Sequence, residues 1–225
     1  MCERTLNLGI DIGSTTIKFV LSDGTNELFS CYERHFSRVR EKTVELLEQV
    51  RALLAGSEAA EAPVRAAISG SAGMGLAEAA HLPFVQEVFA TAEVVKLRQS
   101  DATCAIELGG EDAKIIFFTG GLDQRMNGSC AGGTGAFIDQ MASLLNVSVG
   151  ELDALSLRAE RIYPIASRCG VFAKSEIQPL ITQGARKEDV AASIYQAVVN
   201  QTIAGLAQGR RIEGKVLFLG GPLYY

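Results

Sequence analysis

Two cysteines stand where a thiol would be reactive, each directly ahead of a predicted helix. Cys130 lies in the glycine-rich stretch "NGSCAGGTGAF", and Cys169 lies in "SRCGVFAKSE". The backbone N–H groups and the positive dipole end at a helix N-terminus lower the pKa of a thiol and favour anionic ligands. Both cysteines are therefore candidate metal ligands.

The number of such cysteines leaves three interpretations open. An iron–sulfur cluster is normally held by four thiolates, and a two-fold axis between two chains would supply four from two per chain. Zinc shared by a dimer would fit the same four thiolates. On the spacing alone, the favoured interpretation is that both are small buried hydrophobic side chains, as we expect for Cys2, Cys31 and Cys104.

The stretch "DIGSTTIK" reads as two strands joined by a tight turn that could hold a phosphate. Gly13 lets the backbone approach an anion closely. Asp11 could hold Mg²⁺ through water, and Lys18 could neutralise a β- or γ-phosphate. Donors to phosphate oxygens are the hydroxyls and N–H groups of Ser14, Thr15 and Thr16. Taken alone, the pattern is as typical of an ordinary hairpin as of a nucleotide site.

Two further glycine turns favour the nucleotide interpretation. "ELGGEDAK" repeats the strand, acidic turn and strand pattern of the first, and it offers Glu107, Gly109, Gly110, Asp112 and Lys114 to the opposite side of a triphosphate. "FLGGP" supplies Gly220 and Gly221 at a strand end, suited to close contact with adenosine. A loop beside Cys130 could face both nucleotide and metal through Gly132, Gly133, Thr134 and Gly135.

Three such turns in this order resemble the phosphate and adenosine motifs of the acetate and sugar kinase, heat-shock chaperone and actin superfamily. The resemblance implies a duplicated ribonuclease H-like α/β fold (actin-like ATPase), with two lobes, a nucleotide cleft and a truncated C-terminal part. We expect lobes at 1–100 and 101–225, the second carrying the cluster-binding helices. The predicted catalytic carboxylates are Asp11, Glu107 and Asp112, although Glu107 stands where this pattern usually has Asp.

The two cysteine motifs behind "ELGGEDAK" resemble the ATP-dependent activators of 2-hydroxyacyl-CoA dehydratases, in the BadF/BadG/BcrA/BcrD ATPase family. The resemblance implies a homodimer that binds ATP or ADP with Mg²⁺ and shares one [4Fe–4S] cluster through Cys130 and Cys169 of each chain. ATP hydrolysis would drive one low-potential electron to a dehydratase or a related iron–sulfur protein. The electron would come from a donor such as ferredoxin or flavodoxin.

Two other functions use the same turns. A small-molecule kinase, for example for an amino sugar, would use Asp139 as a base, and an actin-like assembly module would need no catalysis of a second substrate. Neither needs cysteines ahead of two helices, so the cysteine pair favours the activator. His35 and His81 lie far from the glycine turns in the sequence, which predicts surface or loop positions for both.

Composition narrows the classes of protein that fit. A formal net charge of −5 argues against nucleic-acid binding, and no apolar run reaches the length of a membrane span. The first residues lack the pattern of a signal peptide, and five cysteines without a CxxC pair predict no disulfide framework. We therefore expect a cytoplasmic protein with no membrane partner.

Periodicity predicts the elements that position these motifs. Strands are expected on both sides of each acidic turn, at 28–35, 64–71 and 84–90, and at the end in "KVLFLGG". A helix should begin near Val39, and another should follow residue 90 up to a boundary near Ser100 and Asp101. Later helices are expected near 132–145, 151–158, 171–183 and 187–208.

Overall fold

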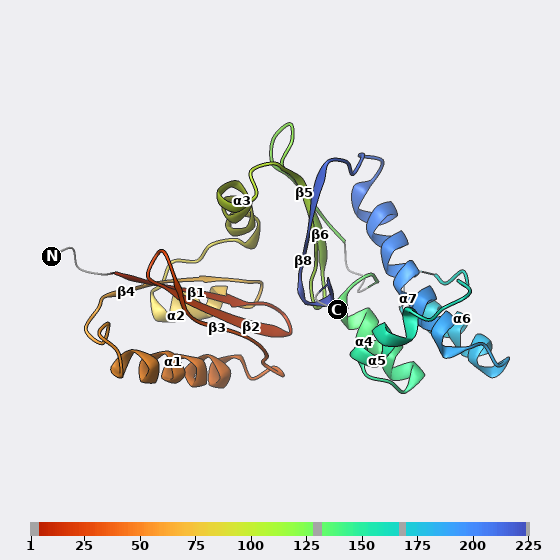
Figure 1. Ribbon diagram of the computed structural model, residues 1–225, viewed down its shortest axis with the longest axis horizontal. Coiled ribbons are helices and arrows are strands. Elements are labelled where there is room, and N and C mark those ends of the chain that lie inside the picture. Colours follow the sequence, from red (N-terminus) through yellow and green to blue (C-terminus); the bar gives the residue numbers. More distant parts are fainter. Residues whose placement is uncertain (1–4, 128–131, 167–169, 224–225) are drawn as a thin grey trace. The chain divides into compact units, whose positions relative to one another are not determined.

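The computed structural model describes residues 5–127, 132–166 and 170–223 (Figure 1). The chain divides into two compact units, residues 1–98 and 99–225. Each unit has its own hydrophobic core, and the two cores share no residue. We therefore describe each unit by itself.

The first unit is built on a four-stranded sheet in the order β3-β2-β1-β4. Its strands are β1 (Leu6–Ile12), β2 (Thr16–Ser22), β3 (Glu27–Arg34) and β4 (Val64–Ser69). In β1 every second side chain is buried, as the period of a strand requires. The helix α1 (Val39–Ala55) contributes Leu46 and Val50 to the same core, so its apolar stripe packs on the sheet.

The end of the first unit differs from the prediction. The stretch 84–90 was expected to be a strand, but α3 (Glu87–Arg98) already begins at Glu87, and only Phe84 forms an isolated bridge, with Ile68. A short apolar run is ambiguous between strand and helix, and here it continues into a longer helical stretch. The short helix α2 (Met74–Ala80) was not predicted.

The second unit repeats the sheet with more helices. Its four-stranded sheet has the order β7-β6-β5-β8. The strands are β5 (Ala102–Leu108), β6 (Ala113–Phe117), β7 (Asp123–Met126) and β8 (Lys215–Leu219). The helices α4 (Gly135–Leu145), α5 (Val149–Ser156), α6 (Gly170–Thr182) and α7 (Lys187–Gln201) lie close to the predicted ranges. After Gln201, α7 continues as a π-helix (Thr202–Ala207).

Both sheets are mixed in the same way. The strand β1 is antiparallel to β2 and parallel to β4, and β5 is antiparallel to β6 and parallel to β8. The predicted α/β fold that is built twice is therefore confirmed. Among the described residues, no helix is both long and apolar enough to cross a membrane.

Side chains of α6 and α7 hold an extended segment that joins α5 to α6. The carboxylate of Asp189 accepts hydrogen bonds from the N–H groups of Glu160 and Arg161, and the Ser193 hydroxyl accepts one from Tyr163. Farther on, the N–H of Ala166 donates to Glu176 of α6. Backbone N–H groups of this segment thus donate to side chains and not to a neighbouring strand.

Candidate functional site

The first glycine turn joins β1 to β2 and brings an ion pair together. Asp11 lies opposite Lys18 in the antiparallel register, and the Lys18 Nζ is 2.6 Å from the Asp11 Oδ2. The N–H of Gly13 donates to the Thr16 carbonyl at 2.9 Å, which closes the turn. The two charged side chains retain 30% and 37% of their exposure, so a ligand can reach both.

His35 contacts this turn. It lies in the loop after β3, as predicted, but it is buried and not at the surface. Its Nε2 lies 3.0 Å from the Gly13 carbonyl oxygen, and the residue is only 5% exposed. The reason is the pairing of β2 with β3, in which Thr16 lies opposite Arg34. Strand pairing thus delivers residue 35 to a turn that is distant in the sequence.

The second glycine turn has the same backbone but a different charge arrangement. Lys114 lies opposite Glu107 in the register, and its Nζ is 3.7 Å from the Glu107 Oε1 and 3.3 Å from the Asp112 Oδ2. Lys114 is only 3% exposed. The Gly109 N–H donates to the Asp112 carbonyl at 2.8 Å. A Cβ on Gly109 would lie 2.2 Å from the Asp112 Oδ1, so a side chain there would displace the Asp112 carboxylate.

The helix that follows Cys130 docks on this second turn. The N–H groups of Gly135 and Ala136, in the first turn of α4, donate to the carbonyls of Gly109 and Gly110 at 2.9 and 2.7 Å. The position of Cys130 ahead of a helix predicts N–H groups that are free for an anion, but these two N–H groups are bonded to the second turn. Their role is instead to join α4 to the acidic turn.

The third glycine turn reaches the same place in the second unit. Gly220 follows β8 with φ +99°, and a Cβ there would lie 2.0 Å from the Leu108 carbonyl oxygen. Gly221 opens a short 3₁₀ turn (Gly221–Leu223). A Cβ on Gly135 would lie 3.2 Å from the Cγ of Pro222. The second turn, the start of α4 and the third turn therefore meet within one unit.

The first unit contains a counterpart of this third turn, which is not among the three predicted glycine turns. Gly70 follows β4 with φ +96°, and a Cβ there would lie 2.2 Å from the Ile12 carbonyl oxygen. The N–H of Ala72 donates to the same carbonyl at 2.9 Å. The signal was available, because "ISGSAG" places a glycine directly after a predicted strand as "FLGGP" does.

Cys130 and Cys169 lie outside the described residues, but described residues on either side are anchored. A Cβ on Gly133 would lie 3.1 Å from the Cγ of Gln201, at the end of α7. Gly132, Gly133 and Thr134 are buried. A Cβ on Gly170 would lie 2.5 Å from the Oε1 of Gln140, in α4. Both cysteine motifs thus lead into helices, α4 and α6, that pack against each other.

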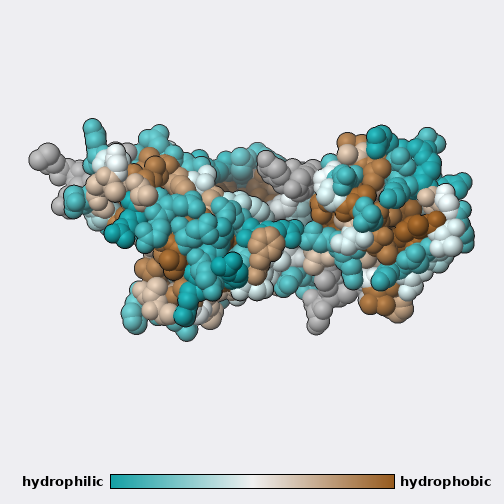
Figure 2. Space-filling view, turned by 90° about the horizontal axis from the view of Figure 1, so that it is seen from below, coloured by the Kyte–Doolittle hydropathy of each residue, from teal (hydrophilic) through white to brown (hydrophobic). Residues whose placement is uncertain are grey.

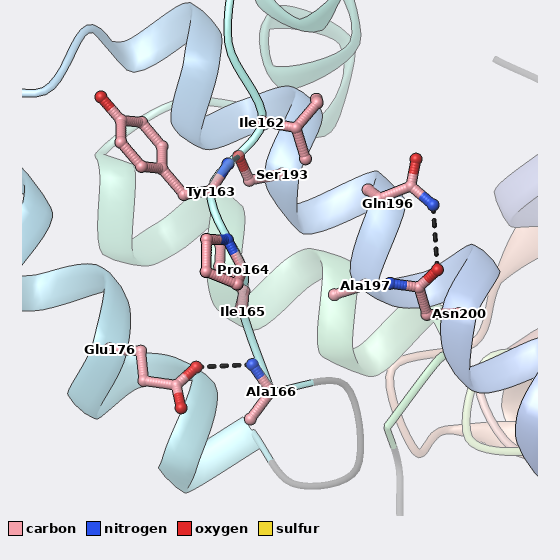
Figure 3. A pocket seen from close by; sticks show the side chains of 10 residues that line it. All are labelled: Ile162, Tyr163, Pro164, Ile165, Ala166, Glu176, Ser193, Gln196, Ala197 and Asn200. Carbon is pink, nitrogen blue, oxygen red and sulfur yellow. Dashed lines mark hydrogen bonds between the residues drawn. The ribbon is translucent and has the colours of Figure 1, made fainter.

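A pocket of about 520 Å³ lies beside the second cysteine motif in the second unit (Figure 3). It is lined by residues 162–166, by Glu176 of α6, and by α7 residues that include Ser193, Gln196 and Asn200. Figure 3 shows Glu176 reaching the N–H of Ala166, and the amide of Gln196 donating to that of Asn200 at 3.0 Å. The hydrogen bond from Ala166 anchors the chain to α6 just ahead of the second cysteine motif.

Asp139, Cys104 and Cys31 were also considered in the sequence, as a candidate base and as structural cysteines. Asp139 is partly buried in α4, and its carbonyl accepts a hydrogen bond from the Ser143 hydroxyl. Burial raises the pKa of the Cys104 thiol, which is 1% exposed, so the expected structural role fits this residue. Burial also raises the pKa of the half-buried Cys31 thiol.

Apolar side chains reach the surface of both units (Figure 2). Val171 and Phe172, in the first turn of α6, are 68% and 65% exposed. They are exposed apolar residues two and three positions after Cys169 in the sequence.

Comparison with known proteins identifies the relatives of this chain. A sequence profile of the BadF/BadG/BcrA/BcrD ATPase family matches residues 8–223. The (R)-2-hydroxyglutaryl-CoA dehydratase activating ATPase of Acidaminococcus fermentans is 38% identical over 118 residues, which are 52% of this chain and 45% of that protein. The alignment thus spans about half the length of this curated relative.

Two solved structures share the fold. The crystal structure of the Acidaminococcus fermentans (R)-2-hydroxyglutaryl-CoA dehydratase component A matches with a TM-score of 0.83 and 27% identity, over 96% of this chain and 83% of that chain. The activator of the 2-hydroxyisocaproyl-CoA dehydratase from Clostridium difficile, solved with bound ADPNP, matches with a TM-score of 0.81 and 27% identity, over 96% and 80%. The two mixed sheets are those of the actin-like ATPase fold.

Proposed function

Because the chain belongs to the BadF/BadG/BcrA/BcrD ATPase family, we propose that it hydrolyses ATP to deliver a low-potential electron to a 2-hydroxyacyl-CoA dehydratase or a related iron–sulfur enzyme. One observation carries the proposal. The helix behind Cys130 is hydrogen-bonded through Gly135 and Ala136 to the acidic glycine turn. A turn that we propose to be part of the nucleotide site is therefore bonded to the helix that follows a candidate cluster ligand in the sequence.

The first glycine turn is suited to the phosphate end of the nucleotide. Asp11 and Lys18 are both partly exposed, and Gly13 opens the turn between them. The Asp11 carboxylate would bind the metal ion. The Lys18 ammonium, now paired with Asp11, would bind a phosphate oxygen. The hydroxyls and N–H groups of Ser14–Thr16 would supply the donors.

The second turn is suited to hold a cation rather than a phosphate. Glu107 and Asp112 retain 23% and 29% side-chain exposure, and Lys114 lies beneath them at hydrogen-bond or ion-pair range. Mg²⁺ takes one or two carboxylates together with phosphate oxygens and water, so this pair fits its chemistry. When bound, Mg²⁺ would neutralise phosphate charge during hydrolysis. Lys114 would act by orienting the two carboxylates.

Cys130 and Cys169 would hold the [4Fe–4S] cluster together with the same residues of a second copy. Thiolates are the normal ligands of such a cluster, which when bound would take up and release one electron. The chemistry of the two cysteine motifs supports this assignment. The exposed Val171 and Phe172 within the second motif also favour a surface that a second copy covers.

The chain's own residues could couple the two sites. A shift of Gly109 or Gly110 on nucleotide exchange would pull the first turn of α4 through two hydrogen bonds. The packing of Gly170 on Gln140 would pass the same movement from α4 to α6. Packed helices respond to such shifts by moving as rigid bodies.

Anaerobic purification and metal analysis test the proposal. We expect brown protein with about four irons and four sulfides per dimer, as a [4Fe–4S] cluster requires. Cys130→Ala and Cys169→Ala should each abolish the colour, the iron and electron delivery to a dehydratase. Cys31→Ala is the matched control, because this cysteine belongs to the first unit and to neither motif, and it should keep the iron.

A second variant separates nucleotide chemistry from the cluster. Asp11→Asn should keep the iron but lower ATP turnover by about 100-fold, a usual loss when a charged catalytic group is removed. A protein that stays free of iron under nitrogen and phosphorylates sugars would contradict the activator and favour a kinase. Normal electron delivery by Cys130→Ala would also contradict the proposal.

A further inference from the structure

The side chain of His35 contacts the first glycine turn in a way that defines its tautomer. Its Nδ1 accepts a hydrogen bond from the backbone N–H of Ser37 at 3.1 Å, so Nδ1 carries no proton. The ring proton of the neutral imidazole is then on Nε2, which lies 3.0 Å from the Gly13 carbonyl oxygen. His35 therefore donates to Gly13.

The backbone of His35 holds a second carbonyl of the same turn. Its N–H donates to the Thr15 carbonyl at 3.2 Å. The turn thus has two of its carbonyls, those of Gly13 and Thr15, bound to one residue. The hydrogen bond between the Gly13 N–H and the Thr16 carbonyl closes the turn from its other side.

Holding a carbonyl also orients the N–H of the next residue. A trans peptide is planar and its C=O and N–H point in opposite directions. With the Gly13 carbonyl turned toward His35, the N–H of Ser14 is turned away from it. The same relation turns the N–H of Thr16 away from the backbone of His35. These are two of the N–H groups that the proposed phosphate site needs.

The loop that carries His35 has an unusual backbone. Phe36 and Ser37 both have left-handed conformations, with φ of +48° and +62°, which residues other than glycine adopt rarely. The N–H of Arg38 donates to the His35 carbonyl at 2.8 Å and closes this tight loop. Such backbone strain persists only where the surroundings hold it, and it is often found at functional sites.

We infer that His35 is a positioning residue, which aims the N–H groups of Ser14 and Thr16 at the phosphates of a bound nucleotide. The inference rests on the proposed function for the identity of the ligand. His35 itself would not touch the nucleotide. It would act through the Gly13 and Thr15 carbonyls.

Two substitutions separate the effects of the hydrogen bonds that the two ring nitrogens make. In His35→Asn the side-chain oxygen can replace Nδ1 as acceptor from Ser37, but the side chain is too short to reach Gly13. In His35→Gln the amide nitrogen can replace Nε2 as donor to Gly13. We expect His35→Asn to bind ADPNP about tenfold more weakly, the effect of losing one hydrogen bond, and His35→Gln to bind within about threefold of the wild type.

The control is His81→Asn, because His81 is the other histidine of the chain and is exposed after α2. Its left-handed φ of +54° is one that asparagine tolerates well. This variant should bind ADPNP as the wild type does. Affinities are measured by calorimetry on the full chain purified under nitrogen. An unchanged affinity in folded His35→Asn would overturn the inference.

Nitrogen NMR of labelled histidine provides a readout that does not depend on a variant folding. The neutral ring of His35 in the wild type should carry its proton on Nε2. A neutral ring with its proton on Nδ1 would overturn the inference. Failure of the wild type to bind ADPNP would instead contradict the proposed function, and the NMR signals would still report whether His35 donates to Gly13.

Discussion

The acidic turns of the two units share a backbone hydrogen bond but differ in how their charged side chains are exposed. In both, a carboxylate two residues before the turn glycine lies opposite a lysine on the next strand, Asp11 with Lys18 and Glu107 with Lys114. In both, the glycine N–H donates to the carbonyl three residues on. The first turn leaves its ion pair partly exposed, whereas the second buries its lysine under two carboxylates.

The exposure of the two lysines indicates which turn can change on ligand binding. An exposed ion pair is weak and can be opened by an incoming phosphate. A buried lysine between carboxylates is costly to disturb, so that turn behaves as a rigid unit. The rigid turn is also the one to which α4 is bonded through Gly135 and Ala136. A rigid second turn would pass a movement on to α4 without deforming.

The largest expected effect tests whether the glycines after β4 and β8 are equivalent. Gly70→Ala and Gly220→Ala should each lower the free energy of unfolding by at least about 3 kcal/mol, because a left-handed backbone and a backbone clash add together. Chemical denaturation followed by circular dichroism measures this change. A mild effect at Gly70 alone would show that only the second unit depends on this close approach.

The controls for this pair are Gly24→Ala and Gly120→Ala. Both glycines have positive φ, +92° and +75°, but a Cβ at either would meet nothing within 4 Å. These variants should cost about 1 kcal/mol, the strain of the left-handed backbone alone. Equal losses in all four variants would mean that strain, and not the clash, dominates.

An intermediate effect compares the two lysines directly. Lys114→Met should destabilise the protein by about 3 kcal/mol, because Glu107 and Asp112 lose a buried cation. Lys18→Met should cost about 0.5 kcal/mol, since its pair with Asp11 is screened by water. Both are measured by denaturation without nucleotide. Equal losses would contradict the electrostatic difference between the two turns.

The smallest effect concerns the extended segment that the second unit adds before α6. The N–H of Glu160, and then that of Arg161, lower the pKa of Asp189 below its ordinary value of 3.8. The lowered pKa stabilises the fold fully above about pH 4, and this contribution is lost as the pH falls through the pKa of the folded state. Asp189→Asn should therefore lose less stability on acidification than the wild type. Melting temperatures between pH 6 and pH 3 would show this, and parallel curves would contradict it.

Much of the fold could be predicted because it depends on local patterns. The alternation of buried and exposed side chains in β1, and the helical periods of α1, α4 and α7, are written in neighbouring residues. The prediction of a strand at 84–90 was wrong, because seven residues carry too little periodicity to separate a strand from a helix. The acidic turns were also visible, since their charged residues flank a glycine within eight positions.

The motifs, their order and the family can be identified from the sequence alone, because each motif lies in a continuous stretch. Which of the motifs meet depends on strand pairing and helix packing. The contact of His35 with Gly13 depends on the pairing of β2 with β3. The bonds between α4 and the second turn depend on how a helix packs on its sheet. Register and packing join residues that are far apart in the chain, and no local pattern specifies them.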